Sequence, residues 1–309
     1  MSHYDRPINS YPSIHEDAVH DIQVNSLGTR LATCSSDGFV VIHSVSEHSL
    51  THIATLSGHA HPVYRLSWST SGLLASAGAS GFLIIFQEQP DSANVYEPLF
   101  KFDHQSPVND VAFFMSSNPE EPSLLATCTA DGYLHIFEQS GDDFTHRKYP
   151  TQSSSCTSVS FHDTLKIIAT GDEEGVVKIW EFRDESFKVA FELNSHSSPI
   201  TDLSFAPSHG IPSVQILASS SSDGQVNIWS GSDKNYHQSS LPTEFSSPVS
   251  RVSWSESGVA LFVSSDVVSV WSRFDGEWSQ IGTLDNQTTE LPKTLGHGSG
   301  VGGRQQLMI

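Results

Sequence analysis

Histidine and aspartate side chains are the residues of this sequence best suited to acid–base or metal chemistry. The chain of 309 residues contains 16 His, including the closely spaced His59 and His61, and several of its Asp residues precede Gly. A His or an Asp acts as acid, base or metal ligand only where it stands in a site with other reactive groups. Whether these residues stand in one such site depends on how the chain positions them.

A motif repeated six times organises these residues. Its anchor is the first apolar residue of an opening strand, and by subtraction successive anchors lie 44, 45, 48, 44 and 49 residues apart. The anchors are Val19, Val63, Val108, Cys156, Ile200 and Val249. This spacing is close to the roughly 40–45 residues of a WD repeat, in which each unit forms one four-stranded propeller blade. One blade cannot bury both faces alone, so the units are expected to stack radially.

Each unit is predicted to contain only strands and turns. In the fifth unit, residues 200–205 alternate between apolar and polar, residues 215–220 follow, and Asp223-Gly224 turns the chain into a third strand ending at Trp229. Alternation flanked by Asp-Gly is a strong hairpin signal. We therefore predict an all-β, six-bladed WD-repeat β-propeller over residues 14–285, with an N-terminal extension at 1–13 and a disordered, Gly-rich tail at 286–309.

The fifth unit also holds a complete set of polar residues that brace such a blade. The set is His196, Ser219, Asp223 and Trp229. Polar groups inside a blade are tolerated only when they satisfy one another's hydrogen bonds. Other units hold incomplete sets, such as His104, Thr127 and Asp131. Because these residues recur at equivalent places, we expect a structural role, with no catalytic residue, no metal site, no cofactor and no enzyme activity.

Composition restricts the partners and the compartment. The formal net charge is −20, and no basic stretch could follow a phosphate backbone, so we expect no direct nucleic-acid binding and no direct membrane insertion. The N-terminus lacks the features of a signal peptide, which predicts a cytosolic or nuclear chain. The three Cys residues are scattered over different units, as expected of buried thiols in a reducing compartment.

The last unit already holds its own fourth strand, at residues 277–284, and the stretch before His15 is a poor strand because it holds two prolines. No overlap of the chain ends would then close the ring. An open ring exposes apolar surface on its first and last blades, which a partner chain could cover by adding strands. We expect the partner-binding residues to include Val19, Val24, Phe262 and Val270, although alternation alone does not tell which faces point into the gap. The alternative is that packing alone holds the end blades together.

Several stretches of the chain resemble the Sec-thirteen and Seh-one family of WD-repeat propellers. They are IHEDAVHDIQVNSLGTRLATCSSDG, GHAHPVYRLSW, SHSSPITDLSFAPSHGIPSVQILASSSSDGQVNIW, and SRVSW followed by DGEWSQIGTLDN. The resemblance implies a non-enzymatic scaffold whose open ring receives a blade from an α-solenoid partner. It implies as partners the Sec-thirty-one coat rod of the COPII vesicle coat, which carries protein from the ER to the Golgi, and the solenoid nucleoporin of the nuclear pore Y-complex. The implied location is cytoplasmic, peripheral at ER exit sites and at nuclear pores.

Departures from the family pattern leave alternatives open. Unit two has Tyr64 where the family usually has Trp, and Ser80 in place of a hairpin Asp; unit three also resembles the Seh-one branch. A Seh-one-like propeller of the nuclear pore or the SEA complex is therefore one alternative. A self-closed adaptor for protein substrates is another, and its binding site would lie on the rim near Arg65, Asp110 and Arg251.

Overall fold

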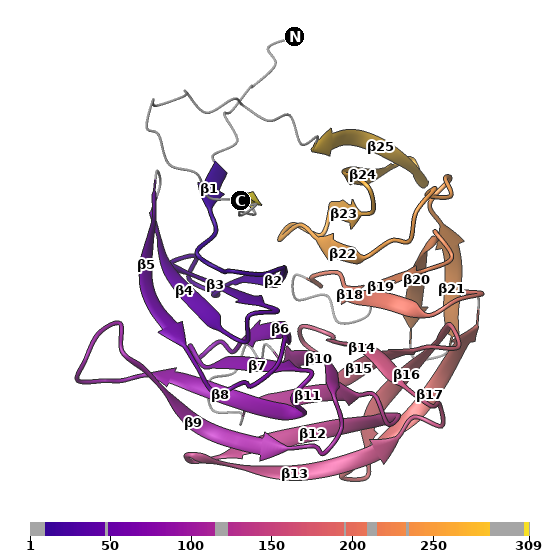
Figure 1. Ribbon diagram of the computed structural model, residues 1–309. Coiled ribbons are helices and arrows are strands. Elements are labelled where there is room, and N and C mark those ends of the chain that lie inside the picture. The colour runs from indigo at the N-terminus through magenta and orange to yellow at the C-terminus, as the bar shows by residue number, and fades with distance from the viewer. Residues whose placement is uncertain are drawn as a thin grey trace, which may run out of the picture.

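The computed structural model shows six antiparallel four-stranded sheets arranged around a central channel (Figure 1). It describes residues 10–46, 49–114, 123–194, 196–208, 215–232, 235–284 and 306–308. Within these residues every regular element is a strand, and no helix could span a membrane. The predicted all-β, six-bladed propeller is confirmed.

The six sheets are numbered as blades 1 to 6 in chain order, and each blade's first strand lies nearest the channel. Blade 1 is β2 (Val19–Val24), β3 (Arg30–Ser35), β4 (Val40–Ser46) and β5 (Ser49–Leu56). Blade 2 is β6 (Val63–Trp68), β7 (Leu74–Gly78), β8 (Phe82–Glu88) and β9 (Tyr96–Asp103). Blade 3 is β10 (Val108–Phe113), β11 (Leu124–Thr129), β12 (Tyr133–Ser140) and β13 (Asp143–Pro150). Blade 4 is β14 (Cys156–Phe161), β15 (Ile167–Asp172), β16 (Val176–Arg183) and β17 (Ser186–Asn194). Blade 5 is β18 (Ile200–Phe205), β19 (Gln215–Ser221), β20 (Val226–Ser232) and β21 (Asn235–Ser240). Blade 6 is β22 (Arg251–Trp254), β23 (Ala260–Ser264), β24 (Val268–Phe274) and β25 (Glu277–Leu284).

The Asp-Gly hairpin of blade 5 illustrates why the turn sequences matter. Gly224 has a φ of 78°, a conformation that glycine adopts without strain. A Cβ at this position would lie only 2.5 Å from the carbonyl oxygen of Phe245, in the segment leading to blade 6. Glycine is therefore required both by the turn and by the close approach of the next blade.

A bulge near the start of the innermost strand recurs in blades 1 to 5. In blade 1 the pairing register with β3 shifts between Val19 and Asp21, and equivalent shifts follow the anchors of the next four blades. A bulge re-aims the side chain that follows it. The residue two places after the anchor is consequently turned toward the channel and the neighbouring blades.

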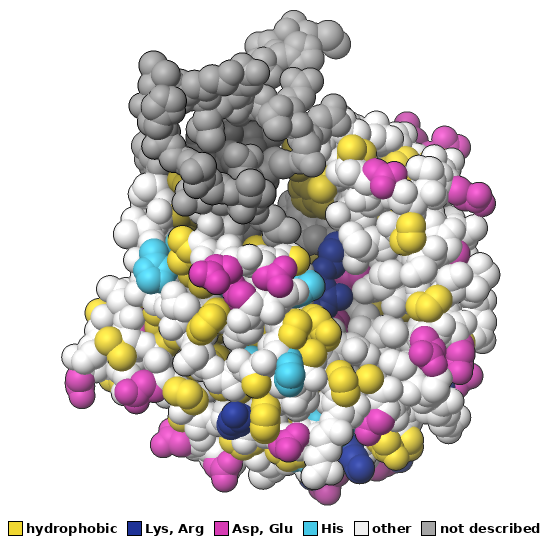
Figure 2. Space-filling model, viewed as in Figure 1, with side chains coloured by type: hydrophobic (Ala, Val, Ile, Leu, Met, Phe, Trp, Pro, Cys, Tyr) yellow, Lys and Arg dark blue, Asp and Glu magenta, His cyan; other side chains and the backbone are white. Residues whose placement is uncertain are grey.

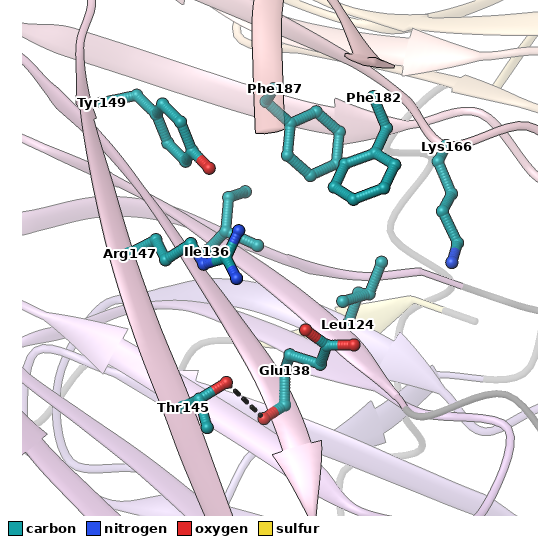
Figure 3. Close-up of a pocket in the computed structure, with 9 residues that line it drawn as sticks. All are labelled: Leu124, Ile136, Glu138, Thr145, Arg147, Tyr149, Lys166, Phe182 and Phe187. Carbon is teal, nitrogen blue, oxygen red and sulfur yellow. Dashed lines mark hydrogen bonds between the residues drawn. The ribbon is translucent and has the colours of Figure 1, made fainter. Parts of the chain in front are cut away.

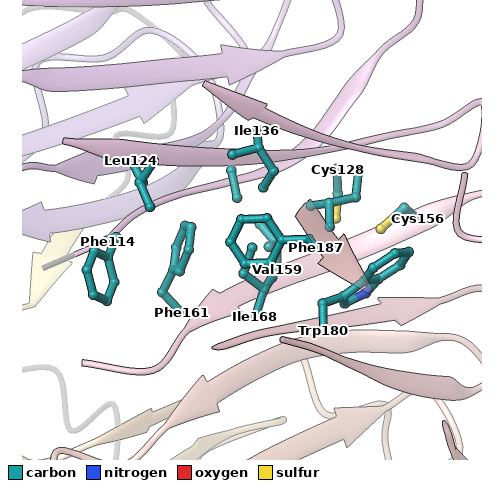
Figure 4. Close-up of a cluster of buried hydrophobic side chains, with 12 residues drawn as sticks. Phe114, Leu124, Cys128, Ile136, Cys156, Val159, Phe161, Ile168, Trp180 and Phe187 are labelled. Carbon is teal, nitrogen blue, oxygen red and sulfur yellow. The ribbon is translucent and has the colours of Figure 1, made fainter. Parts of the chain in front are cut away.

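Five apolar cores hold the blades together, and each lies between two consecutive blades. The core between blades 3 and 4 contains Phe114, Ile136, Phe161 and Trp180 (Figure 4). It also contains the free thiols of Cys128 and Cys156; the third thiol, Cys34, is likewise free and buried, as the sequence predicts. Among the described residues no equivalent core joins blade 6 to blade 1. We call the region between these two blades the opening.

The two ends of the chain pair with each other. Strand β1 (Ser10–Pro12) runs antiparallel to β26 (Gln306–Met308), outside the six blades. This differs from the sequence-based expectation for both segments, because β1 lies in the stretch expected to be a poor strand and β26 in the tail expected to be disordered. Their backbones satisfy one another's hydrogen bonds, which alternation within either segment alone does not reveal. The rest of 286–309 lies outside the described residues.

Candidate functional site

The His, Ser, Asp and Trp set of blade 5 forms one hydrogen-bonded unit. The Nδ1 atom of His196 lies 3.2 Å from Asp223 Oδ2, and its Nε2 atom lies 2.8 Å from Ser219 Oγ. Trp229 Nε1 donates to the same Ser219 oxygen at 2.9 Å. Burial lowers the pKa of His196, against the opposing charge of Asp223. The Ser219 hydroxyl is engaged on both sides, so the arrangement braces strands β19 and β20 and offers no free nucleophile.

Equivalent histidines in other blades make similar bonds with different partners. His15 bonds Asp37 at 2.8 Å and Thr33 at 2.9 Å. In blade 3, His104 bonds Thr127 at 2.9 Å, but its Nδ1 atom meets the carbonyl of Gly81 at 3.1 Å in place of Asp131.

The pair His59 and His61 is also accounted for without a metal. His59 bonds the hydroxyls of Ser76 and Ser80, while His61 is exposed. Across the part of the chain that the structure describes, no cluster of three or more His, Cys, Asp or Glu side chains could hold a metal ion.

Charged side chains lie at the position two residues after the anchor in every blade but blade 4, where this residue is Ser158, and together they form a ring at the channel. Its acidic members tie consecutive blades together in pairs. Asp21 accepts from the backbone N–H of Leu66 at 2.9 Å, Asp110 from Val159 at 2.8 Å, and Asp202 from Val252 at 3.0 Å. These bonds link blade 1 to 2, blade 3 to 4, and blade 5 to 6.

Two arginines complete the ring. Arg65 Nε lies 3.3 Å from Asp110 Oδ1, and Arg251 Nη2 lies 3.2 Å from Asp21 Oδ1. Figure 2 shows basic side chains at the central hollow of this face. Burial raises the pKa of Asp202 to about 7, although Arg65 acts in the opposite direction. Arg65, Asp110 and Arg251, which an adaptor would use on its rim, are instead occupied in holding blades together.

On the face of blade 1 that borders the opening, apolar side chains are exposed, whereas their equivalents in blade 2 are buried. Ile22 is 36% exposed, whereas the equivalent Leu66 of blade 2 is 2% exposed and packs in the core shared with blade 1. Val24 is 47% exposed, whereas the equivalent Trp68 is 5% exposed. Leu66 and Trp68 face blade 1, which is the blade before their own. Ile22 and Val24 hold the equivalent positions in blade 1, so they face the side on which a preceding blade would lie, and this side is the opening.

The opposite face belongs to blade 6. Phe262 pairs with Val270, in the place where Ala32 pairs with Ile42 in blade 1. Ala32 and Ile42 are fully buried against blade 2, but Phe262 and Val270 are only half-buried. Leu284 is 45% exposed at the place where Leu56 of blade 1 is buried. The opening is thus bordered by two apolar faces that lack the neighbour present elsewhere in the ring.

The sequence-predicted partner-binding residues lie on or beside these faces. Val24, Phe262 and Val270 are on them, and Val19 is half-buried at the anchor position next to the channel. Ile22 and Leu284 were not singled out from the sequence. Aligning the repeats would have found them, because their counterparts Leu66 and Leu56 are buried core residues.

A second hollow lies between blades 3 and 4, on the outer side of the ring (Figure 3). Its lining includes Tyr149, Phe182 and Phe187, together with the basic side chains of Arg147 and Lys166. Its volume of about 30 Å³ is room for roughly two water molecules.

The ring of four-stranded blades and the braced His, Ser, Asp and Trp set define a WD-repeat propeller. The family model described as "WD domain, G-beta repeat" matches residues 6–44, 50–87, 96–138, 145–181 and 187–230. Together these segments cover more than half of the chain. Blade 6 lies beyond the last matched segment, although its anchor Val249 follows the same spacing.

Among WD-repeat proteins the chain is similar to transport and nuclear pore proteins. It is 30% identical over 218 residues to protein transport protein SEC13 of Coccidioides immitis, covering 63% of this chain and 71% of that protein. It is 28% identical over 297 residues to protein SEC13 homolog of Drosophila melanogaster, covering 86% of this chain and 81% of that protein. It is 29% identical to nucleoporin SEH1-A of Xenopus laevis, covering 63% of this chain and 62% of that protein. The chain belongs to the SEC13 family of WD-repeat proteins.

Proposed function

We propose that the chain is a non-enzymatic scaffold that binds an α-solenoid partner, whose strands enter the opening as an additional blade. As in the family it resembles, the partner would be a Sec-thirty-one-like rod of the COPII outer coat, a solenoid nucleoporin of the nuclear pore Y-complex, or both. The chain would then act in the cytoplasm, at ER exit sites and at nuclear pores, always as part of a hetero-oligomer. A role closer to that of SEH1 is the alternative within the same mode of binding.

The observation that carries this proposal is that six blades share only five apolar cores in the described residues. Every other blade face of this kind is covered by a neighbour. The faces that carry Val24 and Phe262 present equivalent positions without one. An added blade would contact both faces at once, and interfaces that stay associated typically bury about 2,000 Å² or more. The partner would therefore be a stoichiometric subunit.

The charge of the molecule is consistent with this role. A net charge of −20 disfavours direct binding to anionic lipid headgroups or to nucleic acid. Assembly into a coat or a pore would then depend on the solenoid partner, which would bring the propeller to the membrane.

The test is a tagged pull-down from native cells at moderate salt, with partners identified by mass spectrometry and quantified by stoichiometry. We expect one solenoid protein at a one-to-one ratio, and its identity separates the coat from the pore. Val24→Asp should reduce its recovery at least tenfold, because a charge would be buried against the inserted blade. The matched control is Val95→Asp, because Val95 is 45% exposed, about as much as Val24 at 47%, but lies in blade 2 away from the opening.

Two outcomes would contradict the proposal. Recovery of the chain as a monodisperse monomer, with other proteins present only in substoichiometric amounts, would favour a self-closed adaptor. Equal recovery of a stoichiometric partner by the Val24→Asp and Val95→Asp variants would place the partner on another surface.

A further inference from the structure

An aromatic residue follows the hairpin glycine in each of the first three blades. These residues are Phe39 in blade 1, Phe82 in blade 2 and Tyr133 in blade 3. The ammonium group of Lys101 lies 3.9 Å from the centroid of the Phe82 ring, and that of Lys148 lies 4.5 Å from the centroid of the Tyr133 ring. At such distances the negative face of an aromatic ring attracts a positive charge. Blades 2 and 3 therefore each supply a cation to their own ring.

Blade 1 has the aromatic ring but lacks the lysine. Lys101 and Lys148 each pair, on the outermost strand of their blade, with the residue two places after the ring. In blade 1 the residue paired in this way is Thr55, opposite Val41. Across the described residues no cation lies over the Phe39 ring, which is 42% exposed. Phe39 is thus a ring of the same kind whose face is left to accept a charge from another chain.

The histidine beside Thr55 does not take the place of the missing lysine. The Nε2 atom of His52 lies 3.0 Å from the Thr55 hydroxyl oxygen. The His52 ring meets the ring of His43 edge-on, with 6.0 Å between the ring centroids. Within the part of the chain that the structure describes, it makes no ring contact with Phe39.

The surroundings of Phe39 carry negative charge. The backbone N–H of Phe39 donates to Asp37 Oδ1 at 2.9 Å, and that of Glu16 donates to Asp37 Oδ2 at 3.1 Å. Burial acts to raise the pKa of Asp37, but the hydrogen bonds from Phe39 and His15 outweigh it, so the pKa is lowered and the carboxylate is charged at neutral pH. Glu16 and Asp17 are exposed, and Figure 2 shows acidic side chains gathered over blade 1 on this face. A cation at Phe39 would therefore be attracted by the ring and by carboxylates together.

Phe39 also lies on the side from which a partner would approach. Phe82 packs against the core that blade 2 shares with blade 1, so it faces the preceding blade. Phe39 holds the equivalent position in blade 1, where the preceding side is the opening. We infer that Phe39 and Asp37 form a docking point for a lysine or arginine side chain of the partner protein that enters the opening. The identity of this occupant rests on the proposed function, whereas the capacity of the ring to hold a cation does not.

That capacity is tested in the free, full chain with Thr55→Lys, which restores the lysine found in blades 2 and 3. Protons that lie over the face of an aromatic ring give NMR signals shifted upfield. With isotope-labelled lysine, we expect the ε-methylene signal of the introduced lysine to lie upfield of that of the exposed Lys188. The shift should disappear in Thr55→Lys/Phe39→Leu. An unshifted signal in Thr55→Lys would overturn the inference, because a lysine at the equivalent place would not then be held by the ring.

The contact with the partner is tested with the protein recovered in the pull-down. Phe39→Leu should raise the dissociation constant of the full chain for this partner roughly threefold to thirtyfold, the range for a cation–π contact that becomes desolvated. Thr55→Lys should also raise it, because the chain's own lysine would occupy the ring and repel the partner's cation. Thr55→Met is the matched control, since methionine is similar in length to lysine but uncharged, and it should weaken binding clearly less.

The outcomes separate this inference from the proposed function. Equal affinities of the unaltered chain and Phe39→Leu, or equal effects of Thr55→Lys and Thr55→Met, would overturn the inference and leave the proposed function in place. A pull-down without a stoichiometric partner would remove the proposed function and, with it, the occupant named here. The NMR measurement uses no partner, so a ring that holds no cation is recognised whatever the pull-down shows.

Discussion

Arg251 of the last blade lies 3.2 Å from Asp21 of the first, measured between Nη2 and Oδ1. The same guanidinium donates to the carbonyl of His20 at 3.1 Å. Blades 1 and 6 therefore meet at the channel, although the described residues of these blades share no apolar core farther out. Blades 1 and 6 are thus joined at the inner edge of the ring, and their facing surfaces farther out are apolar. This arrangement is consistent with the proposed insertion of an additional blade between them.

The Arg251 contact leads to the first prediction. Arg251→Met should lower the free energy of unfolding by about 1–3 kcal/mol, because it leaves the buried Asp21 carboxylate without its partner across the opening. Urea denaturation measures this change. Arg273→Met is the control, since Arg273 is exposed at the end of β24 and should change stability by less than about 0.5 kcal/mol. Equal effects of the two substitutions would mean that the contact does not hold the ring.

A second prediction compares equivalent residues on a covered and an uncovered face. Leu66→Ala should cost about 2–5 kcal/mol of stability, because Leu66 is 2% exposed in the core between blades 1 and 2. Ile22→Ala should cost less than about 1 kcal/mol in the free chain, since Ile22 is 36% exposed. Urea unfolding curves of the two variants measure these losses of stability. A loss for Ile22→Ala as large as that for Leu66→Ala would show that blade 6 already covers this face.

The braced set of blade 5 gives a third prediction. Ser219→Ala would leave both Trp229 Nε1 and His196 Nε2 without the hydroxyl they share, at a cost of about 1–3 kcal/mol. In the double variant Ser219→Ala/Trp229→Phe the indole N–H is absent, so the added cost of Trp229→Phe should be smaller than in the unaltered chain. A double-mutant cycle measures this coupling. Strictly additive costs would mean that the two residues act independently.

The sequence predicts the blades well because each blade is a local object. Hairpin turns such as Asp223-Gly224 and the spacing of anchors such as Val63 and Val108 are set within 50 residues. The ion pairs within the charged ring could not be predicted from the sequence. The partners of Arg251 include Asp21, 230 positions away, and they become neighbours only once the sixth blade returns to the first.

The faces of the opening were predictable only in part, for a related reason. Alternation along a strand assigns side chains to two faces, but the face that lacks a neighbour is fixed by how the ring ends. Val24 lies on such a face, and so does Ile22, which alternation alone did not distinguish. The pairing of β1 with β26 is the extreme case, since each strand is short and acquires its hydrogen bonds only from the far end of the chain.

A fourth prediction concerns the stability at acid pH, because two buried histidines and the half-buried His59 resist protonation. Burial lowers the pKa of His59 and of His104 to about 4, and burial with the nearby charges of His104 and His146 lowers the pKa of His135 to about 3. In the unfolded chain a histidine titrates near pH 6.5. Between these values the unfolded chain binds protons that the folded chain does not. Their contribution to stability is therefore complete above about pH 6.5 and is lost as the pH falls toward 4.

The buried Asp202 acts in the opposite sense over an overlapping range, because its pKa is raised to about 7, and stability falls as the pH rises through that value. Comparing variants with the unaltered chain separates the two effects. His59→Asn should reduce the slope of unfolding free energy against pH between pH 6 and 4.5 by up to about 1.4 kcal/mol per pH unit, the value for one proton. His61→Asn, at an exposed position two residues away, is the matched control. If both variants kept the full slope, His59 would be protonated in the folded chain over this range, and burial would not be lowering its pKa.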